Sequence, residues 1–178
     1  MIWRLMRPAA LAGLLAVSTA VPAAPADDFF DQTLGDFQDE LETAREEGKQ
    51  GILIMFETDD CPFCHRMRKT VLNRPEVQAF FKKHFRIFSL DIEGDVEITD
   101  FKGRTLREKD FAFKEFRVRA TPVFGFFDLS GNMQVRYTGA TSGKDEFMWL
   151  GDYVVQKAYK QMSFSRYRRQ RKQMGERR

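Results

Sequence analysis

The chain has little cysteine: two among 178 residues, Cys61 and Cys64, three positions apart. Two cysteines cannot form the framework of a disulfide-dense scaffold, and a bridge across so short a loop adds little stability. Proline (6) and glycine (12) are also scarce, and no repeat or low-complexity segment occurs, which argues against wholesale disorder. With 43% hydrophobic residues, a chain of this length can bury one core without covalent help. A bond between the two cysteines is therefore expected to serve chemistry.

The amino end lacks acidic residues and a full-length membrane span. Its first 26 residues contain Arg4 and Arg7, an apolar run over 9–20, and small residues up to Ala26. This is the pattern of a secretory signal peptide cleaved near Ala26. The apolar run is shorter than the ~20 residues of a transmembrane helix, and an uncleaved anchor is the alternative. The sequence thus predicts an exported protein in a compartment that permits disulfides.

The carboxyl end is rich in cations. Residues 165–178 hold seven Lys or Arg and one acid, Glu176. Such a tail suits contact with anionic lipid or an acidic partner, or it is a solvated, frayed helix end. Nucleic acid does not fit an exported protein. We expect a signal peptide (1–26), one domain (27–164) and a basic tail (165–178).

Hydrophobic periodicity predicts alternating helices and short strands in the domain. The strands are expected at 52–56, 86–90, 123–127 and 134–137, the last two forming a hairpin. Because 52–56 is apolar throughout, this strand is expected to be covered on both faces. The helices are expected at 36–47, at 62–72, from Pro75 to near His84, from Leu106 to about Arg117, and after Ser142 with an apolar face reaching Tyr159. Thr105 and Glu108 form a capping-box pattern before the fourth of these helices, and 93–103 reads as a hairpin or irregular insertion.

The cysteine pair lies where the first strand gives way to a helix. Free backbone N–H groups and about half a positive charge at a helix amino terminus stabilise a thiolate. Cys61, the more exposed cysteine, is the expected nucleophile, and Cys64, one turn into the helix, is the expected resolving thiol. Nearby cations favour the thiolate and nearby acids, among them Glu57, oppose it, so the reduction potential stays open. His65 either tunes the thiolate or is an ordinary surface residue.

The cysteine pair has three other interpretations. Cys61, Cys64 and His65 also form the C-x-x-C-H pattern of covalent haem attachment, with His65 as the axial ligand, but a strand before the motif and a hairpin after it do not suit a helical haem pocket. A zinc site would need His84 as a fourth ligand, although His84 falls on a different helix. The third interpretation is a structural bridge without chemistry.

The sequence resembles the thioredoxin superfamily over about 36–162. The resemblance is carried by the strand 52–56, the helix that begins at Cys61, the pair Thr121-Pro122 about 60 residues later, and the closing hairpin and helix. It implies an α/β thioredoxin-like fold, with a central mixed sheet of four to five strands flanked by helices and a small insertion (about 93–105) before the third core helix. It also implies a cis Pro122 beside the disulfide and a Thr121 backbone that pairs with a bound protein.

The resemblance implies a thiol:disulfide oxidoreductase whose redox group is the Cys61–Cys64 dithiol, with no other cofactor and no metal. The remaining residues at the site are expected to support it: Pro62, Phe63, His65 and Glu57. Two positions depart from the family pattern. Met55 and Ser89 stand where related proteins often have a buried aspartate and a lysine, so Glu57 or water remains as the proton acceptor for Cys64.

Export, the insertion and the basic tail are similar to the periplasmic thioredoxins that accompany sulfur-oxidation systems (SoxW-like). The expected function is therefore a periplasmic, monomeric reductase of protein disulfides that takes electrons from a membrane thiol conduit. A disulfide donor or isomerase is the alternative within the class, and a non-catalytic protein-binding module is the alternative outside it.

Overall fold

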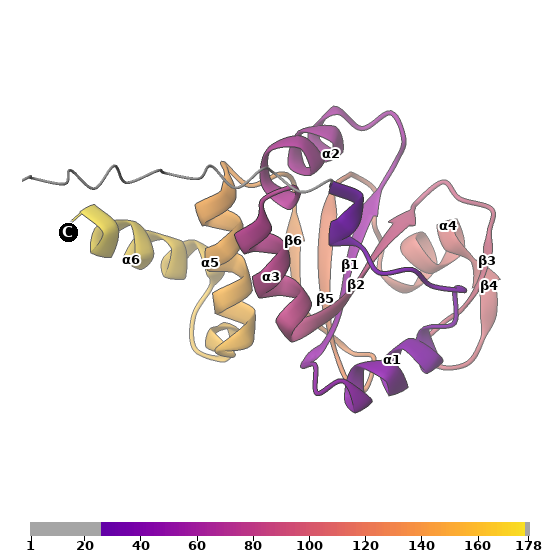
Figure 1. Ribbon diagram of the computed structural model, residues 1–178. Helices are drawn as coiled ribbons and strands as arrows, with labels where there is room; N and C mark the ends of the chain where they lie inside the picture. Colours follow the sequence, from indigo (N-terminus) through magenta and orange to yellow (C-terminus); the bar gives the residue numbers. More distant parts are fainter. Residues whose placement is uncertain (1–25, 177–178) are drawn as a thin grey trace, which may run out of the picture.

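A four-stranded mixed sheet forms the centre of the protein (Figure 1). The structure is a computed structural model that describes residues 26–176. The strand order is β2-β1-β5-β6, in which β1 pairs parallel with β2 and antiparallel with β5. The strands are β1 (Gly51–Glu57), β2 (Phe85–Asp91), β5 (Val123–Asp128) and β6 (Met133–Thr138).

Both faces of β1 are covered, as its unbroken apolar run predicts. Ile52 and Ile54 point to the face that packs against α1 (Phe37–Glu46) and the helical segment over 108–115. Leu53 and Met55 point to the other face, under α2 (Pro62–Met67), α3 (Pro75–His84) and α5 (Lys144–Val155). The sheet therefore separates two phenylalanine-rich cores, and the described structure confirms the α/β class with four strands in the central sheet (Figure 1).

Local sequence signals explain where the first helices begin and end. The Asp36 carboxylate accepts hydrogen bonds from the N–H groups of Gln38 (2.9 Å) and Asp39 (3.2 Å) and so caps α1. Gly48 follows the helix with φ +67°, a conformation that favours glycine. Pro75 is the first residue of α3, where its fixed φ suits a helix and its missing N–H costs nothing.

The predicted helix from Leu106 to about Arg117 is wrong at its start. Residues Thr105–Arg107 form β4, which pairs antiparallel with β3 (Glu97–Thr99), so Thr105 is a strand residue and caps nothing. Buried Asp100 closes this hairpin by accepting the N–H groups of Lys102 (2.8 Å) and Arg104 (2.9 Å). Pairing along the hairpin outweighed the local capping pattern. Helical structure begins only at α4 (Glu108–Asp110) and continues as a π-helical turn, η3 (Phe111–Glu115).

The expected last helix is divided into two. The helix α5 ends at Val155, Lys157 takes a left-handed conformation (φ +54°), and a short 3-10 turn, η4 (Ala158–Lys160), leads to α6 (Phe164–Glu176). Tyr153 explains the reversal, because its hydroxyl donates to the carbonyl of Met162 (2.7 Å) and its ring contacts those of Tyr159, Phe164 and Tyr167. Ala158 and Tyr159 therefore do not extend the apolar face of α5.

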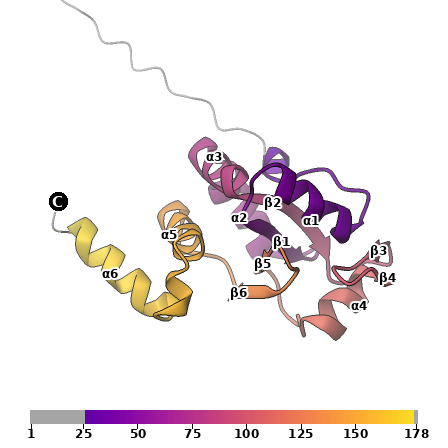
Figure 2. The ribbon, with the colours of Figure 1, turned by 90° about the horizontal axis from the view of Figure 1, so that it is seen from below.

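The described part of the basic tail packs one helical face against the domain. Tyr167 is buried, Arg168 pairs with the buried Glu146 (2.7 Å), and Arg171 pairs with Asp152 (2.9 Å). Glu146 also accepts hydrogen bonds from Ser142 (Oγ, 2.5 Å) and the Tyr137 hydroxyl (3.2 Å). The prediction of a solvated, frayed end does not hold for this face. Both views place α6 and the β3–β4 hairpin at opposite ends of the protein (Figures 1 and 2).

The amino end enters the described structure at a short 3-10 turn, η1 (Ala26–Phe29), whose Phe29 is buried against Phe81 and Phe147. The predicted signal peptide (1–26) lies outside the described residues apart from Ala26. Of the described helices, none has the length and apolar character needed to cross a membrane.

Candidate active site

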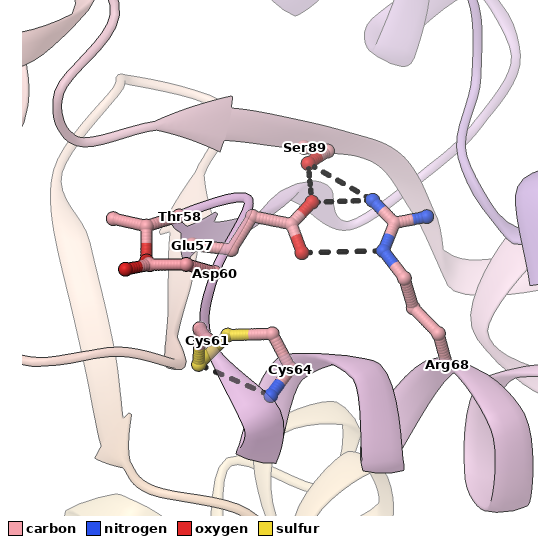
Figure 3. The surroundings of a disulfide bond; sticks show 7 residues. All are labelled: Glu57, Thr58, Asp60, Cys61, Cys64, Arg68 and Ser89. Carbon is pink, nitrogen blue, oxygen red and sulfur yellow. Dashed lines mark hydrogen bonds and ion pairs between the residues drawn. A yellow bond between two sulfur atoms is a disulfide. The ribbon is translucent and has the colours of Figure 1, made fainter.

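Cys61 and Cys64 form a disulfide at the beginning of α2, with their Cα atoms 5.3 Å apart (Figure 3). Cys61 is the residue that caps the helix, and its Sγ accepts the N–H of Cys64 (3.1 Å). Cys61 is 6% exposed and Cys64 1% exposed, so the first cysteine is the more accessible one, as the sequence predicts. A hydrogen-bond donor aimed at Cys61 Sγ and the helix amino terminus around it both favour a negative charge on that sulfur.

The sheet brings Thr121 and Pro122 to the same end of its central strands as the cysteines. The Thr121–Pro122 peptide bond is cis, as the resemblance implies. The next residue, Val123, pairs with Phe56 near the end of β1, and Phe124 packs in the same core as Cys61 and Cys64. Two motifs about 60 residues apart in sequence thus meet where β1 ends and β5 begins.

A group that the sequence did not reveal as a unit lies on the strand side of the disulfide (Figure 3). The Glu57 carboxylate accepts hydrogen bonds from the Arg68 guanidinium (Nε, 3.2 Å) and from the Ser89 hydroxyl. The Arg68 guanidinium also lies over the ring of Phe30, 4.4 Å from its centroid. Sequence spacing contained a signal for Arg68, since it follows Cys64 by one helical turn. Arg68 is one of several cations that follow the motif in sequence, and the pattern alone does not single it out.

Met55 and Ser89, the two positions that depart from the family pattern, are direct neighbours in the sheet. Glu57 lies two residues after Met55 and therefore points to the same face of β1. Buried Met55 supplies no acid, and the ion pair of this site lies one pleat further toward the end of the strand. A comparison of positions 55 and 89 with the family pattern does not reveal this ion pair, because its acid is Glu57 and its cation is Arg68.

The other predicted residues of the motif face solvent. Pro62 and His65 are exposed, and Phe63 is 56% exposed. The His65 side chain makes no hydrogen bond or ion pair with any described residue, which agrees with the surface interpretation. Arg66 covers Phe63, with its guanidinium carbon 5.6 Å from the ring centroid.

The zinc interpretation is wrong for the described residues. His84 lies at the end of α3, where its carbonyl accepts the N–H of Gln50 just before β1, at the opposite end of that strand from Cys61. Burial lowers the pKa of His84. No three metal-ligating side chains come together anywhere in residues 26–176. The C-x-x-C-H helix also rests on a mixed sheet, an environment without the helical pocket that haem attachment requires.

The pattern of the thioredoxin-like domain family matches residues 37–155. The protein belongs to this family. Solved structures agree with the fold: a thioredoxin-fold protein from Helicobacter pylori has a TM-score of 0.64 at 17% identity, with 85% of this chain and 97% of the other covered. The DsbH oxidoreductase has a TM-score of 0.54 at 18% identity, with 85% of this chain and 96% of the other covered. A thioredoxin from Thermus thermophilus has a TM-score of 0.52 at 22% identity, with 70% of this chain and 88% of the other covered. No curated protein matches the chain.

A thioredoxin-like domain that carries a C-x-x-C disulfide at the start of α2 is a thiol:disulfide oxidoreductase, and this protein is one. A bridge across so short a loop constrains the unfolded chain little, which argues against a purely structural role for it. Membership of the superfamily and the class of enzyme are thereby confirmed.

Proposed function

We propose that the protein is a periplasmic reductase of protein disulfides. The observation that carries this proposal is the placement of the Cys61–Cys64 disulfide at a helix amino terminus, at the end of the central strands where Pro122 lies. The signal-peptide pattern of 1–26 supports the location, where disulfides form and persist. A membrane thiol conduit is the electron source that we propose, and a protein of a sulfur-oxidation system is one candidate partner.

The reaction transfers two electrons to the partner. The Cys61 thiolate attacks one sulfur of the partner disulfide, forming a mixed disulfide and releasing the first partner thiol. The Cys64 thiol then gives up its proton and attacks Cys61 Sγ, which releases the second partner thiol and forms the Cys61–Cys64 disulfide. A dithiol of the electron donor reduces this disulfide again, and no other redox group takes part.

Thr121 offers backbone groups for docking the partner. Its N–H and C=O make no hydrogen bond with any described residue, while Pro122 is held by the N–H of Gly139, which donates to the Pro122 carbonyl (2.8 Å). An extended partner segment pairs with such a free stretch of backbone next to a strand start. Pro62 and Phe63 complete the exposed rim on the α2 side.

Glu57 is the group we assign to accept the proton of Cys64. Its carboxylate pairs with Arg68, is only 13% exposed, and lies on the sheet face that the disulfide covers. A carboxylate in this position takes the proton directly or through one water molecule when Cys64 attacks. Met55 offers no alternative, and Ser89 serves by fixing the carboxylate.

Replacing Glu57 with glutamine should slow the resolution of the mixed disulfide about tenfold near neutral pH, because general-base assistance is lost while water still accepts the proton. Rapid-quench measurement of the mixed disulfide would detect its accumulation. The defect should shrink as the pH rises, since hydroxide then deprotonates Cys64 without help. Glu57→Asp keeps the carboxylate and should recover part of the rate. An equal defect in both variants at every pH would show that Glu57 acts only through packing.

The function is tested by trapping. A protein in which Cys64 is replaced by alanine should remain covalently bound to its partner through Cys61, because no resolving thiol is left. Mass spectrometry of complexes isolated from periplasm would identify the partner. A single sulfur-carrier protein or maturation factor supports the reductase role, whereas many unrelated secreted proteins together with a strongly oxidising potential would indicate a disulfide donor or isomerase. A partner that binds equally well without both cysteines would indicate a binding module.

A further inference from the structure

Two exposed phenylalanines are each covered by arginine: Phe63 lies within the cysteine motif, and Phe113 lies beneath Arg119, which precedes Pro122 by three residues. Phe63 is 56% exposed beneath Arg66, and Phe113 is 44% exposed beneath both Arg117 and Arg119. The guanidinium carbons lie 5.6, 5.8 and 5.4 Å from the respective ring centroids. Most other phenylalanines in residues 26–176 are buried or half-buried in the two cores, so these rings are exceptions to the general packing. We call these five residues the docking edge.

Hydrogen bonds and short stretches of chain connect the two ends of the docking edge past Pro122. On the α2 side, the Arg66 guanidinium donates to the carbonyl of Thr141 (3.5 Å) in the loop after β6. In the same loop, the Gly139 N–H donates to the Pro122 carbonyl. Arg119 precedes Pro122 by three residues and reaches back over Phe113. A segment that docks along Thr121 would therefore have an arginine-covered ring near each of its ends.

The arginines of this edge have charge available for a ligand. Arg66, Arg117 and Arg119 make no ion pair with any residue in 26–176, whereas Arg68 and Arg86 are both paired with carboxylates. A guanidinium that lies on a ring keeps its N–H donors free around its margin, where they match a carboxylate. The stacking also restricts the side chain before binding, which lowers the entropy lost when a ligand binds.

The backbone of Arg117 lies in a left-handed conformation that is unfavourable for an arginine. Arg117 has φ +53° at the end of η3, a helix-ending position that favours glycine. Its carbonyl and that of Phe116 accept hydrogen bonds from Arg136 (3.5 and 2.7 Å), which fixes this corner. A strained residue held by its surroundings is a reason to look for a function of its side chain.

At the end of the sheet where β1 ends and β5 begins, acidic residues follow β1 and basic residues precede β5. The order β2-β1-β5-β6 puts the exposed acids Asp59 and Asp60, which follow β1, on one side of the entry to β5. Asp95, beyond the end of β2, is already paired with Arg107 (2.9 Å) and Lys109 (2.5 Å). Arg117 and Arg119 precede β5. A ligand with negative charge is therefore favoured along the Pro122 side and repelled by Asp59 and Asp60.

We propose that the docking edge selects partner proteins whose reactive cysteine lies in an extended segment with acidic residues close to it on both sides. The acidic side chains bind Arg66 at one end and Arg117 with Arg119 at the other, while the segment pairs with Thr121. This inference rests on the proposed function and adds the chemistry of the substrate. It gives the enzyme a preference that the disulfide alone does not provide.

The test compares three synthetic peptides that differ only near one cysteine, which carries glutamate, glutamine or lysine on both sides. Each cysteine is joined to 2-thiopyridine, so that reduction by the protein dithiol releases the peptide thiol and thiopyridone and leaves the Cys61–Cys64 disulfide. We expect kcat/KM for the glutamate peptide to exceed that for the lysine peptide about tenfold at low salt, since each exposed ion pair contributes a factor of about two to five. The difference should nearly vanish at ~1 M salt, where charges are screened beyond about 3 Å.

The variant Arg117→Gly/Arg119→Gln should reduce the glutamate-to-lysine ratio to about twofold without lowering the urea midpoint, because glycine relieves the backbone at position 117. Arg169→Gln removes an exposed arginine of α6 and should keep the wild-type ratio. An equal ratio in wild type and double variant, or a preference for the lysine peptide, would overturn the proposal. Salt-sensitive binding of anionic lipid vesicles to wild type but not to the double variant, without peptide discrimination, would assign the edge to a membrane and also overturn it. If the glutamine peptide is not reduced at all, the proposed function itself fails.

Discussion

Replacing Cys61 with serine should abolish the reduction of protein disulfides, with kcat/KM falling by at least about a thousandfold. A serine hydroxyl is not ionised near neutral pH and cannot form the mixed disulfide on which electron transfer depends. The helix amino terminus and the Cys64 N–H, which favour a charge on Cys61 Sγ, have no thiolate to act on in this variant. Insulin reduction monitored by turbidity, with dithiothreitol as the electron source, measures the loss.

Cys61 belongs to the buried core, so the fold of the variant has to be checked separately. The urea midpoint of the Cys61→Ser protein should be compared with that of the wild type after reduction, because both then lack the disulfide. Similar midpoints together with lost activity would assign the defect to chemistry. Full activity of the Cys61→Ser protein would show that another group performs the attack and would reject the assignment of the nucleophile.

The second large effect is expected on stability. Phe81→Ala should lower the free energy of unfolding by about 3–5 kcal/mol, the usual cost of removing a buried aromatic ring without refilling its space. Phe81 is 0% exposed, and its ring stacks on that of Phe147 (centroids 4.5 Å apart) and contacts Phe29 and Phe126. It therefore joins the amino end, α3, α5 and the sheet. Urea unfolding followed by circular dichroism measures the change.

Two matched variants make this measurement decisive. Phe63→Ala removes the same ring from an exposed position and should change stability by less than about 0.5 kcal/mol. Phe81→Leu leaves a smaller cavity and should cost clearly less than Phe81→Ala. A similar loss from the alanine variants at positions 63 and 81 would mean that the core around Phe81 is not packed as described.

The elements predicted well from sequence are those specified by their own residues. The strand β1 was predicted from its apolar run, the start of α3 from Pro75, and the end of α1 from Gly48. The meeting of Cys61 with Pro122 was also predictable, but only through resemblance to a family, because nothing in the spacing alone brings them together. Each of these features was thus indicated either by a local sequence pattern or by the resemblance to the family.

The errors occurred where distant contacts decided the outcome. The Thr105–Glu108 pattern is a valid local signal, yet pairing of Leu106 with Ile98 made the segment a strand. No proline or glycine follows α5 to predict the break in the helix, which depends instead on packing around Tyr153. The Glu57–Arg68–Ser89 group joins a strand end, a helix and a neighbouring strand, so no single stretch of sequence contains it.

The attachment of α6 has a consequence for the response of the protein to acid. Hydrogen bonds from Ser142 and the Arg168 pair outweigh burial and hold the pKa of Glu146 below its usual value, while burial and the same carboxylate raise the pKa of Tyr137 to about 12. The carboxylate is thus ionised and the phenol protonated at neutral pH. Because the pKa of Glu146 is lower in the folded protein, its contribution to stability is complete above the ordinary glutamate range and is lost as the pH falls through the folded value. The ion pair between Arg168 and Glu146 that holds α6 against α5 therefore persists in mild acid and is lost in strong acid.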